Sequence, residues 1–146
     1  MAGSDELVHE LQIRNLIARL AHATDFASDE ELDSKYLGCF TEDGIWEAPA
    51  PAGGEGGVVR RGHAELRAAS MDRRRTKVGG PGSHTMHVVT PGEIRIQGNE
   101  AFAVSNFVYY SLAEGAPKAI TAGLYHDSFR YADGAWRVSR RSIKRP

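Results

Sequence analysis

Residues 100–112, EAFAVSNFVYYSL, form the stretch on which the predicted fold depends. In an extended strand successive side chains point to opposite sides, so the even-numbered residues share one face and the odd-numbered residues share the other. Neither face is suited to water: the even one carries Phe102, Val104, Val108 and Tyr110, and the odd one carries Ala101, Ala103, Phe107 and Tyr109. Such a strand must be covered twice, by helices on one side and by another layer or another subunit on the other.

The strand belongs to a predicted meander of four, over residues 83–96, 100–112, 119–131 and 135–143. Gly98-Asn99 and Asp133-Gly134 are dipeptides typical of tight hairpin turns, and Gly115-Ala116-Pro117 makes the middle connection. The last strand carries basic side chains on both faces, which is typical of an edge strand protected from further pairing.

Helices are predicted before the meander. Between residues 6 and 25 the apolar positions recur at intervals of three and four, so one helical stripe faces the sheet: Ile13, Leu16, Ile17, Leu20, Ala21 and Thr24. Ser28 and Glu31 have the spacing of a capping box, which predicts a second helix that ends near Phe40. A third helix is predicted over residues 64–75.

The segments between these helices are predicted to be short or irregular. Residues 41–44 indicate a turn, and residues 45–48 a short strand that Pro49 ends. The glycines and prolines of residues 49–57 predict a flexible rim, and Gly79-Gly80-Pro81-Gly82 a second one. Basic residues 73–75 are interpreted as a solvated helix end, which the helix dipole favours.

Composition excludes several classes of function. The 146 residues suit one domain, and 18 basic against 19 acidic residues leave a net charge of −1, which argues against nucleic-acid and membrane partners. There is no apolar run for a membrane span and no secretory signal at the N-terminus. The single cysteine, Cys39, excludes an internal disulfide and fits a reducing compartment, so we expect a cytoplasmic protein.

His87 is the histidine placed best for chemistry. It lies within the strand sequence TMHVVT, where burial favours the neutral imidazole that a general base requires. Asp25 lies at the C-terminal end of the first helix, where the helix dipole disfavours a negative charge. If the two residues meet, Asp25 can hold one ring nitrogen and direct the other toward a substrate. A histidine satisfied within the core is the structural alternative.

Other chemistries find less support. The six histidines show no metal-binding spacing, so we expect no metal and no cofactor. His9 and His22 are expected to face solvent. No G-x-S-x-G sequence is present for a serine nucleophile. Tyr109 and Tyr125 are candidate proton donors, although buried tyrosines in a sheet are often structural.

The order of elements and several sequences resemble the SnoaL-like domains of the nuclear transport factor 2-like superfamily. The resemblance covers nearly the whole chain and rests on FTEDGIWEAP after the second helix, RGHAEL at the start of the third, TMHVV on a strand, and GLYHDSFRYADGAWRVSRR near the end. It implies an α+β fold in which residues 1–146 form a single domain, a cone-shaped α+β barrel with three N-terminal helices on a curved, mainly antiparallel sheet.

The resemblance also implies a site. Scytalone dehydratase, bile-acid 7α-dehydratase and hexachlorocyclohexane dehydrochlorinase use a pocket histidine and an aspartate near the end of the first helix, and His87 and Asp25 match these positions. Family pockets open on the odd-numbered face, so substrate contacts are expected from Tyr36, Trp46, Phe107, Tyr109, Ser111, Tyr125, Asp127 and Phe129. This pocket would be aromatic with few polar groups and suited to a hydrophobic ring-containing small molecule. The other face would form a homodimer or homotrimer interface.

The implied function is a cofactor-independent lyase of the dehydratase type, acting by β-elimination through the Asp25–His87 dyad. Two alternatives stay open. The chain can be a non-catalytic small-molecule-binding protein or an accessory subunit of the same fold. It can also be an isomerase or cyclase that uses the same histidine to move a proton.

Overall fold

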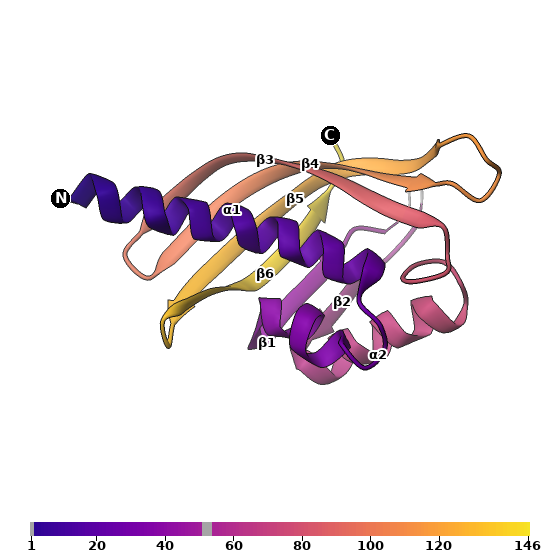
Figure 1. Cartoon of the computed structure of the whole chain (residues 1–146), viewed down its shortest axis with the longest axis horizontal. Coiled ribbons are helices and arrows are strands. Elements are labelled where there is room, and N and C mark those ends of the chain that lie inside the picture. The colour runs from indigo at the N-terminus through magenta and orange to yellow at the C-terminus, as the bar shows by residue number, and fades with distance from the viewer. Residues whose placement is uncertain (1, 51–53) are drawn as a thin grey trace.

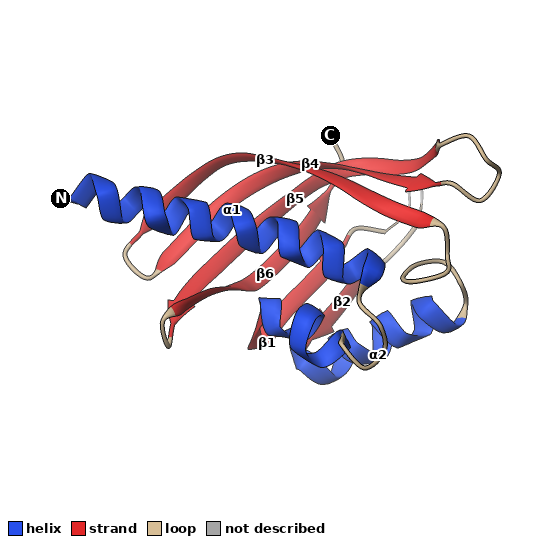
Figure 2. Cartoon of the chain, in the orientation of Figure 1, coloured by secondary structure: helices blue, strands red, loops and turns tan. Residues whose placement is uncertain are grey.

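The structure is a computed structural model that describes residues 2–50 and 54–146. A six-stranded sheet carries its helices on one face (Figure 1, Figure 2). The elements along the chain are α1 (Ala2–Phe26), η1 (Leu32–Tyr36), η2 (Leu37–Cys39), β1 (Phe40–Ala48), β2 (Val58–Arg61), α2 (Gly62–Arg75), β3 (Thr85–Gln97), β4 (Glu100–Ser111), β5 (Lys118–Ala132) and β6 (Ala135–Lys144). The strand order is β2-β1-β6-β5-β4-β3, and all neighbours are antiparallel except β1 and β6. The predicted α+β class is confirmed.

The predicted meander is confirmed. Strands β3 to β6 pair in sequence order, and Asp133 and Gly134 join β5 to β6 as a two-residue loop with φ values of 52° and 74°. Two successive positive φ values match the right-handed twist of a hairpin, which is why an Asp-Gly pair suits this turn. Along β4 the odd-numbered residues from Ala101 to Tyr109 are buried and the even-numbered ones are exposed or half-buried.

Helix α1 covers the sheet as its stripe predicts. Ile13, Leu16, Ile17 and Leu20 are each at most 1% exposed, and they pack with strand residues such as Ala101, Phe129 and Val138. The helix lies across the sheet in Figure 1, with its C-terminal end over the strands near α2. The stripe therefore forms the core beneath most of α1, and the C-terminal end of the helix lies over the strands near α2.

The second predicted helix is only partly correct. The capping box forms, because the Glu31 carboxylate accepts from the Ser28 backbone N–H at 3.1 Å and the Ser28 hydroxyl accepts from the Glu31 N–H at 3.2 Å. The helix that follows is a single π turn and a short 3₁₀ turn. The turn predicted over residues 41–44 is wrong, because strand β1 already begins at Phe40 and absorbs these residues in an irregular register.

Strand β6 is not the edge that its basic residues suggest. It lies between β5 and β1, and the sheet edges are β2 and β3. Two of its charges are paired with neighbouring strands: Arg141 faces the helices and binds Asp127 of β5, while Arg140 faces outward and binds Glu47 of β1. The prediction failed because the parallel pairing of β1 with β6 joins residues far apart in the sequence, such as Ile45 and Arg140.

Strand β3 bends at Pro91 and Gly92. The register with β4 shifts after Pro91, and a Cβ atom at Gly92 would overlap the carbonyl oxygen of Val104. Proline lacks the N–H of a sheet ladder and is tolerated on an edge strand, and glycine permits the close backbone approach. This irregularity falls between His87, which faces the helices, and the hairpin at Gly98.

Among residues 2–50 and 54–146, no layer covers the outer face of the sheet. On this face Phe102 of β4 is 36% exposed and Val104 of β4 is 39% exposed, and Val88 of β3 is exposed as well. The homodimer or homotrimer expected from the sequence stays a prediction. No helix in the described part of the chain is both long enough and apolar enough to span a membrane.

We expect Phe102→Glu to shift the protein toward the monomer, because a carboxylate in an apolar interface would lose its hydration. Sedimentation velocity over a range of protein concentrations measures this. Leu11→Glu is the matched control, since Leu11 is exposed on α1. A wild-type protein that is monomeric at every concentration would contradict the expectation.

Candidate active site

Asp25 and His87 meet between the end of α1 and strand β3. Oδ1 of Asp25 lies 2.7 Å from Nδ1 of the imidazole, and Oδ2 accepts the backbone N–H of His87 at 2.7 Å. Asp25 is 2% exposed, and the side chain of His87 is 10% exposed. The two N–H donors compensate a carboxylate that the helix dipole disfavours at this end. A carboxylate only accepts, so Nδ1 carries a hydrogen, and the neutral imidazole in this tautomer has its lone pair on Nε2.

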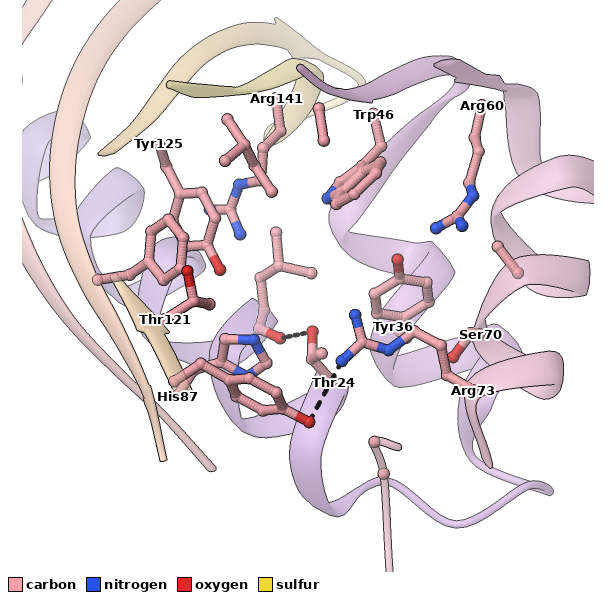
Figure 3. A pocket seen from close by; sticks show the side chains of 18 of the residues that line it. Thr24, Tyr36, Trp46, Arg60, Ser70, Arg73, His87, Thr121, Tyr125 and Arg141 are labelled. Atoms are coloured by element: carbon pink, nitrogen blue, oxygen red, sulfur yellow. Dashed lines mark hydrogen bonds between the residues drawn. The ribbon is translucent and has the colours of Figure 1, made fainter. Parts of the chain in front are cut away.

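A cavity of about 400 Å³ opens beside this pair, between α1, α2 and the sheet (Figure 3). His87 forms part of its wall, whereas Asp25 lies behind the imidazole and does not reach the cavity surface. This volume is in the range of sites that enclose small organic molecules.

Aromatic rings form the wall around His87. Its ring stacks on Tyr109, with centroids 4.4 Å apart, because the two residues are direct partners across β3 and β4. Phe107 and Tyr125 stack at 4.2 Å, and Arg141 lies over the Tyr125 ring with Cζ 3.9 Å from its centroid. These flat faces favour a planar or ring-shaped ligand.

Five of the residues expected to contact substrate line the cavity, and three do not. Those that line it are Tyr36, Trp46, Phe107, Tyr109 and Tyr125. Asp127 is bound by Arg141, and Phe129 belongs to the hydrophobic core. Ser111 lies at the end of β4 and accepts the backbone N–H of Ala113. These three residues were placed on the correct face of the sheet but too far from the cavity.

The tyrosines of the cavity differ in how their hydroxyls are used. Tyr109 donates to the carbonyl oxygen of Val78 and accepts from Arg73 at 3.4 Å, so its hydrogen is already engaged. Within residues 2–50 and 54–146, no hydrogen bond to the hydroxyl of Tyr36 or Tyr125 is found, and both residues line the cavity. Burial raises the pKa of Tyr36 and raises that of Tyr125 to about 12. Both hydroxyls therefore stay protonated at neutral pH and can donate to a ligand.

The cavity is more polar than the sequence indicated. Its wall includes Arg60, Arg73, Arg74, Arg141, Lys144 and Arg145, and none of the residues that line it is Asp or Glu. Arg73 and Arg74 were assigned to a solvated helix end, and Arg60, which lies on strand β2, was assigned to no element. A signal for Arg73 was present: Leu66, Ala69 and Arg73 recur at helical spacing, so Arg73 continues the inward stripe of α2.

Arg141 and Asp127 form a buried ion pair beside the cavity. The guanidinium donates two hydrogen bonds of 2.8 Å to the two carboxylate oxygens, and the residues are cross-strand partners on β6 and β5. Burial alone would lower the pKa of Arg141, but the carboxylate of Asp127 raises it, so the guanidinium remains charged. The pair places a cation against Tyr125 without leaving it unbalanced.

In the described part of the chain, no three side chains of His, Cys, Asp or Glu gather where they could hold a metal ion.

The expectation that His9 faces solvent is wrong. His9 accepts the indole N–H of Trp136 at 3.0 Å and packs edge-on against Tyr131, so it closes the end of the core instead of facing solvent. His22 is exposed, as expected.

The structure thus places a hydrogen-bonded Asp25–His87 pair beside a cavity of small-molecule size in an α+β cone. The chain belongs to the SnoaL-like domain family, whose model matches residues 5–142. No curated protein matches the chain in sequence.

Solved structures share the fold at low sequence identity. A protein of unknown function from Mycobacterium tuberculosis has a TM-score of 0.77 and 24% identity, covering 98% of this chain and 75% of that one. A candidate scytalone dehydratase from Novosphingobium aromaticivorans has a TM-score of 0.68 and 18% identity, and the match covers 99% of this chain and 87% of that one. The beta subunit of a candidate aromatic-ring-hydroxylating dioxygenase from the same organism has a TM-score of 0.71 and 17% identity, and the match covers 94% of this chain and 89% of that one.

Removing one partner of the Arg141–Asp127 pair should destabilise the fold strongly. Arg141→Met and Asp127→Leu should each lower the free energy of unfolding by about 3–5 kcal/mol, because each leaves a buried charge without its partner. The double variant should recover most of that loss. Urea unfolding of the four proteins measures it, and additive losses in the double variant would contradict the coupling.

The stability of the protein should fall between about pH 10 and about pH 12, partly because of Tyr125. Burial raises its folded pKa to about 12, above the ordinary tyrosine pKa of 10.0, so the unfolded chain loses the proton first and rising pH favours unfolding. The stabilisation from this residue is complete below about pH 10 and amounts to about 2–3 kcal/mol. Urea unfolding of Tyr125→Phe at several alkaline pH values should show a shallower decline. An unchanged slope would contradict the assignment.

Proposed function

We propose that this protein is a cofactor-independent lyase of the dehydratase type that acts on a ring-containing small molecule. The observation that carries the proposal is the double hydrogen bond from His87 to the buried carboxylate of Asp25, beside a cavity of small-molecule size. It holds the imidazole in one tautomer, with a basic nitrogen available to a ligand.

In the proposed reaction His87 is the general base. Nε2 removes a proton from a ring carbon, the C–H electron pair forms a carbon–carbon double bond, and a hydroxyl on the adjacent carbon leaves with its bonding pair. The Tyr125 hydroxyl protonates the leaving oxygen, so that water forms, and regains its proton from the imidazolium through solvent. Asp25 stabilises the imidazolium and does not touch the substrate.

The surrounding groups suit such a substrate. The stacked rings of Tyr109 and His87, and of Phe107 and Tyr125, form flat walls against which a ring can lie. The free hydroxyls of Tyr36 and Tyr125 offer donors for ketone or hydroxyl oxygens on that ring. The candidate scytalone dehydratase among the similar folds agrees with this class of reaction.

Proton removal can be tested before the substrate is known. Nitrobenzisoxazole is a flat bicyclic compound that opens to a coloured phenolate when a base removes its ring proton. We expect the protein to accelerate this opening, His87→Ala to lower the rate about 100-fold or more, and Asp25→Asn to lower it at least about tenfold because the tautomer is no longer fixed.

His22→Ala is the matched control, since His22 is exposed on the same helix as Asp25. Circular dichroism of each variant separates loss of chemistry from loss of fold. An activity that His87→Ala retains would remove His87 as the base. With a natural substrate, mass analysis of the product separates a lyase, which releases water, from an isomerase or cyclase, whose product keeps the substrate mass.

A second candidate function is that of a non-catalytic binding or accessory subunit. The fold shared with the beta subunit of a candidate dioxygenase favours it. In that case the cavity would bind ring compounds, and wild type and His87→Ala would open the probe equally slowly.

A further inference from the structure

The charge of the cavity wall differs from that of the chain as a whole. The protein has a net charge of −1, yet six basic residues and no acidic residue line the cavity. Two of the six are balanced from behind: Arg141 by Asp127, and Arg74 by Asp29 and the carbonyl oxygen of Ala27. Lys144 and Arg145 are exposed at the chain end. The positive charge inside the cavity therefore comes mainly from Arg60 and Arg73.

Arg60 and Arg73 have no anionic partner. Neither forms an ion pair with any carboxylate of the described residues, and residues 1 and 51–53 include no Asp or Glu. Both are half-buried, one on β2 and the other on α2. Two like charges that point toward one cavity repel each other, and this arrangement is stabilised when an anion enters between them.

Both guanidiniums are held in place by aromatic rings. Cζ of Arg60 lies 4.9 Å from the ring centroid of Trp46, its direct partner across β1 and β2. Cζ of Arg73 lies 5.7 Å from the ring centroid of Tyr109, and Nη2 of Arg73 donates a hydrogen bond of 3.4 Å to the Tyr109 hydroxyl. Figure 3 shows both side chains directed into the cavity from the side opposite Tyr125. Stacked guanidiniums are pre-organised, and their N–H groups match the two oxygens of an anionic group.

The glycine-rich segment after α2 makes room for Arg73. A Cβ atom at Gly79 would lie 2.8 Å from Nη2 and 2.9 Å from Nε of Arg73. Gly79 also lines the cavity and is buried. The segment that the sequence suggested as a pocket rim is thus the surface against which this guanidinium rests.

We propose that Arg60 and Arg73 form a binding site for an anionic oxygen group, a carboxylate or a phosphate ester, carried by the ring compound that fills the cavity. Arg73 contacts Tyr109, and Tyr109 stacks on His87, so the anionic end of the ligand lies one aromatic ring away from the basic nitrogen. The hydrophobic ring-containing ligand expected from the sequence is thereby specified further, as one with a flat apolar body and one anionic end. In naming the substrate class, this inference rests on the proposed function; the binding site itself does not require turnover.

The test compares naphthalene probes of one shape and different charge by isothermal titration calorimetry: naphthoate, naphthyl phosphate and the neutral naphthamide. We expect one of the anions to bind at least about tenfold more tightly than the amide, and the tighter anion identifies the natural group. Arg73→Gln and Arg60→Gln should each reduce this preference to about threefold or less. Added salt should weaken binding of the anion and leave the amide unchanged.

Arg75→Gln is the matched control, because Arg75 is exposed on the same turn of α2 and pairs with Asp72. Gly79→Ala keeps the charge but displaces the guanidinium, so it should weaken anion binding while the amide binds as before. This variant serves if Arg73→Gln does not fold.

Equal binding of the anions and the amide by the wild type, or an anion preference that Arg73→Gln, Arg60→Gln and Gly79→Ala all retain, would overturn the inference. Binding and proton removal are measured separately, so the two proposals fail separately. Selective anion binding without any opening of nitrobenzisoxazole leaves this site standing and removes the lyase. Opening that depends on His87, without an anion preference, does the reverse.

Discussion

The carboxylate of Asp25 joins the helical layer to the sheet at the point where the cavity opens. It lies in the last turn of α1, where the helix dipole disfavours a negative charge, and it accepts both the backbone N–H and the ring N–H of His87. One interaction therefore fixes the end of the helix, the backbone of β3 and the orientation of the imidazole. The apolar stripe of α1 places Asp25 there, because Leu20 and Ala21 pack one turn earlier. The geometry of the site is thus a consequence of how the helix packs on the sheet.

The cavity exists because the sheet is only partly covered. Beneath the N-terminal part of α1 the sheet is filled by Ile13, Phe129 and Trp136. Near the end of the helix, His87, Tyr109 and Tyr125 lie on the same sheet face and line the cavity, whose wall also includes Thr24 of α1 and Arg73 of α2. Two rows of paired residues cross the sheet at this end: His87, Tyr109 and Thr121 form one, and Arg60, Trp46, Arg141 and Asp127 form the other. The first row carries His87, the proposed base, and the second carries most of the charge.

Local patterns predicted much of this structure. The period of α1, the alternation of β4 and the Asp133-Gly134 turn each depend on residues close in sequence, and each was predicted correctly. What failed depends on distant residues. The central place of β6 follows from its pairing with β1, and strand β2 forms only because it pairs with β1 as well. Arg60 was missed with its strand. Arg73 was missed because a run of three arginines was taken as one solvated surface, although consecutive helical residues point in directions about 100° apart.

The position of the carboxylates explains how one cavity can hold both the proposed base and the proposed anion site. An acid exposed in the wall would repel an anionic ligand and would also pair with Arg60 or Arg73, which would remove the free cations. Here the acids lie one layer back: Asp25 behind the imidazole and Asp127 behind Arg141. Each still acts on the cavity through the group it holds, Asp25 by fixing the tautomer of His87 and Asp127 by keeping Arg141 charged. The surface that a ligand meets therefore offers hydrogen-bond donors, aromatic faces and one basic nitrogen. That combination favours a ligand rich in acceptor oxygens from which a proton can be taken.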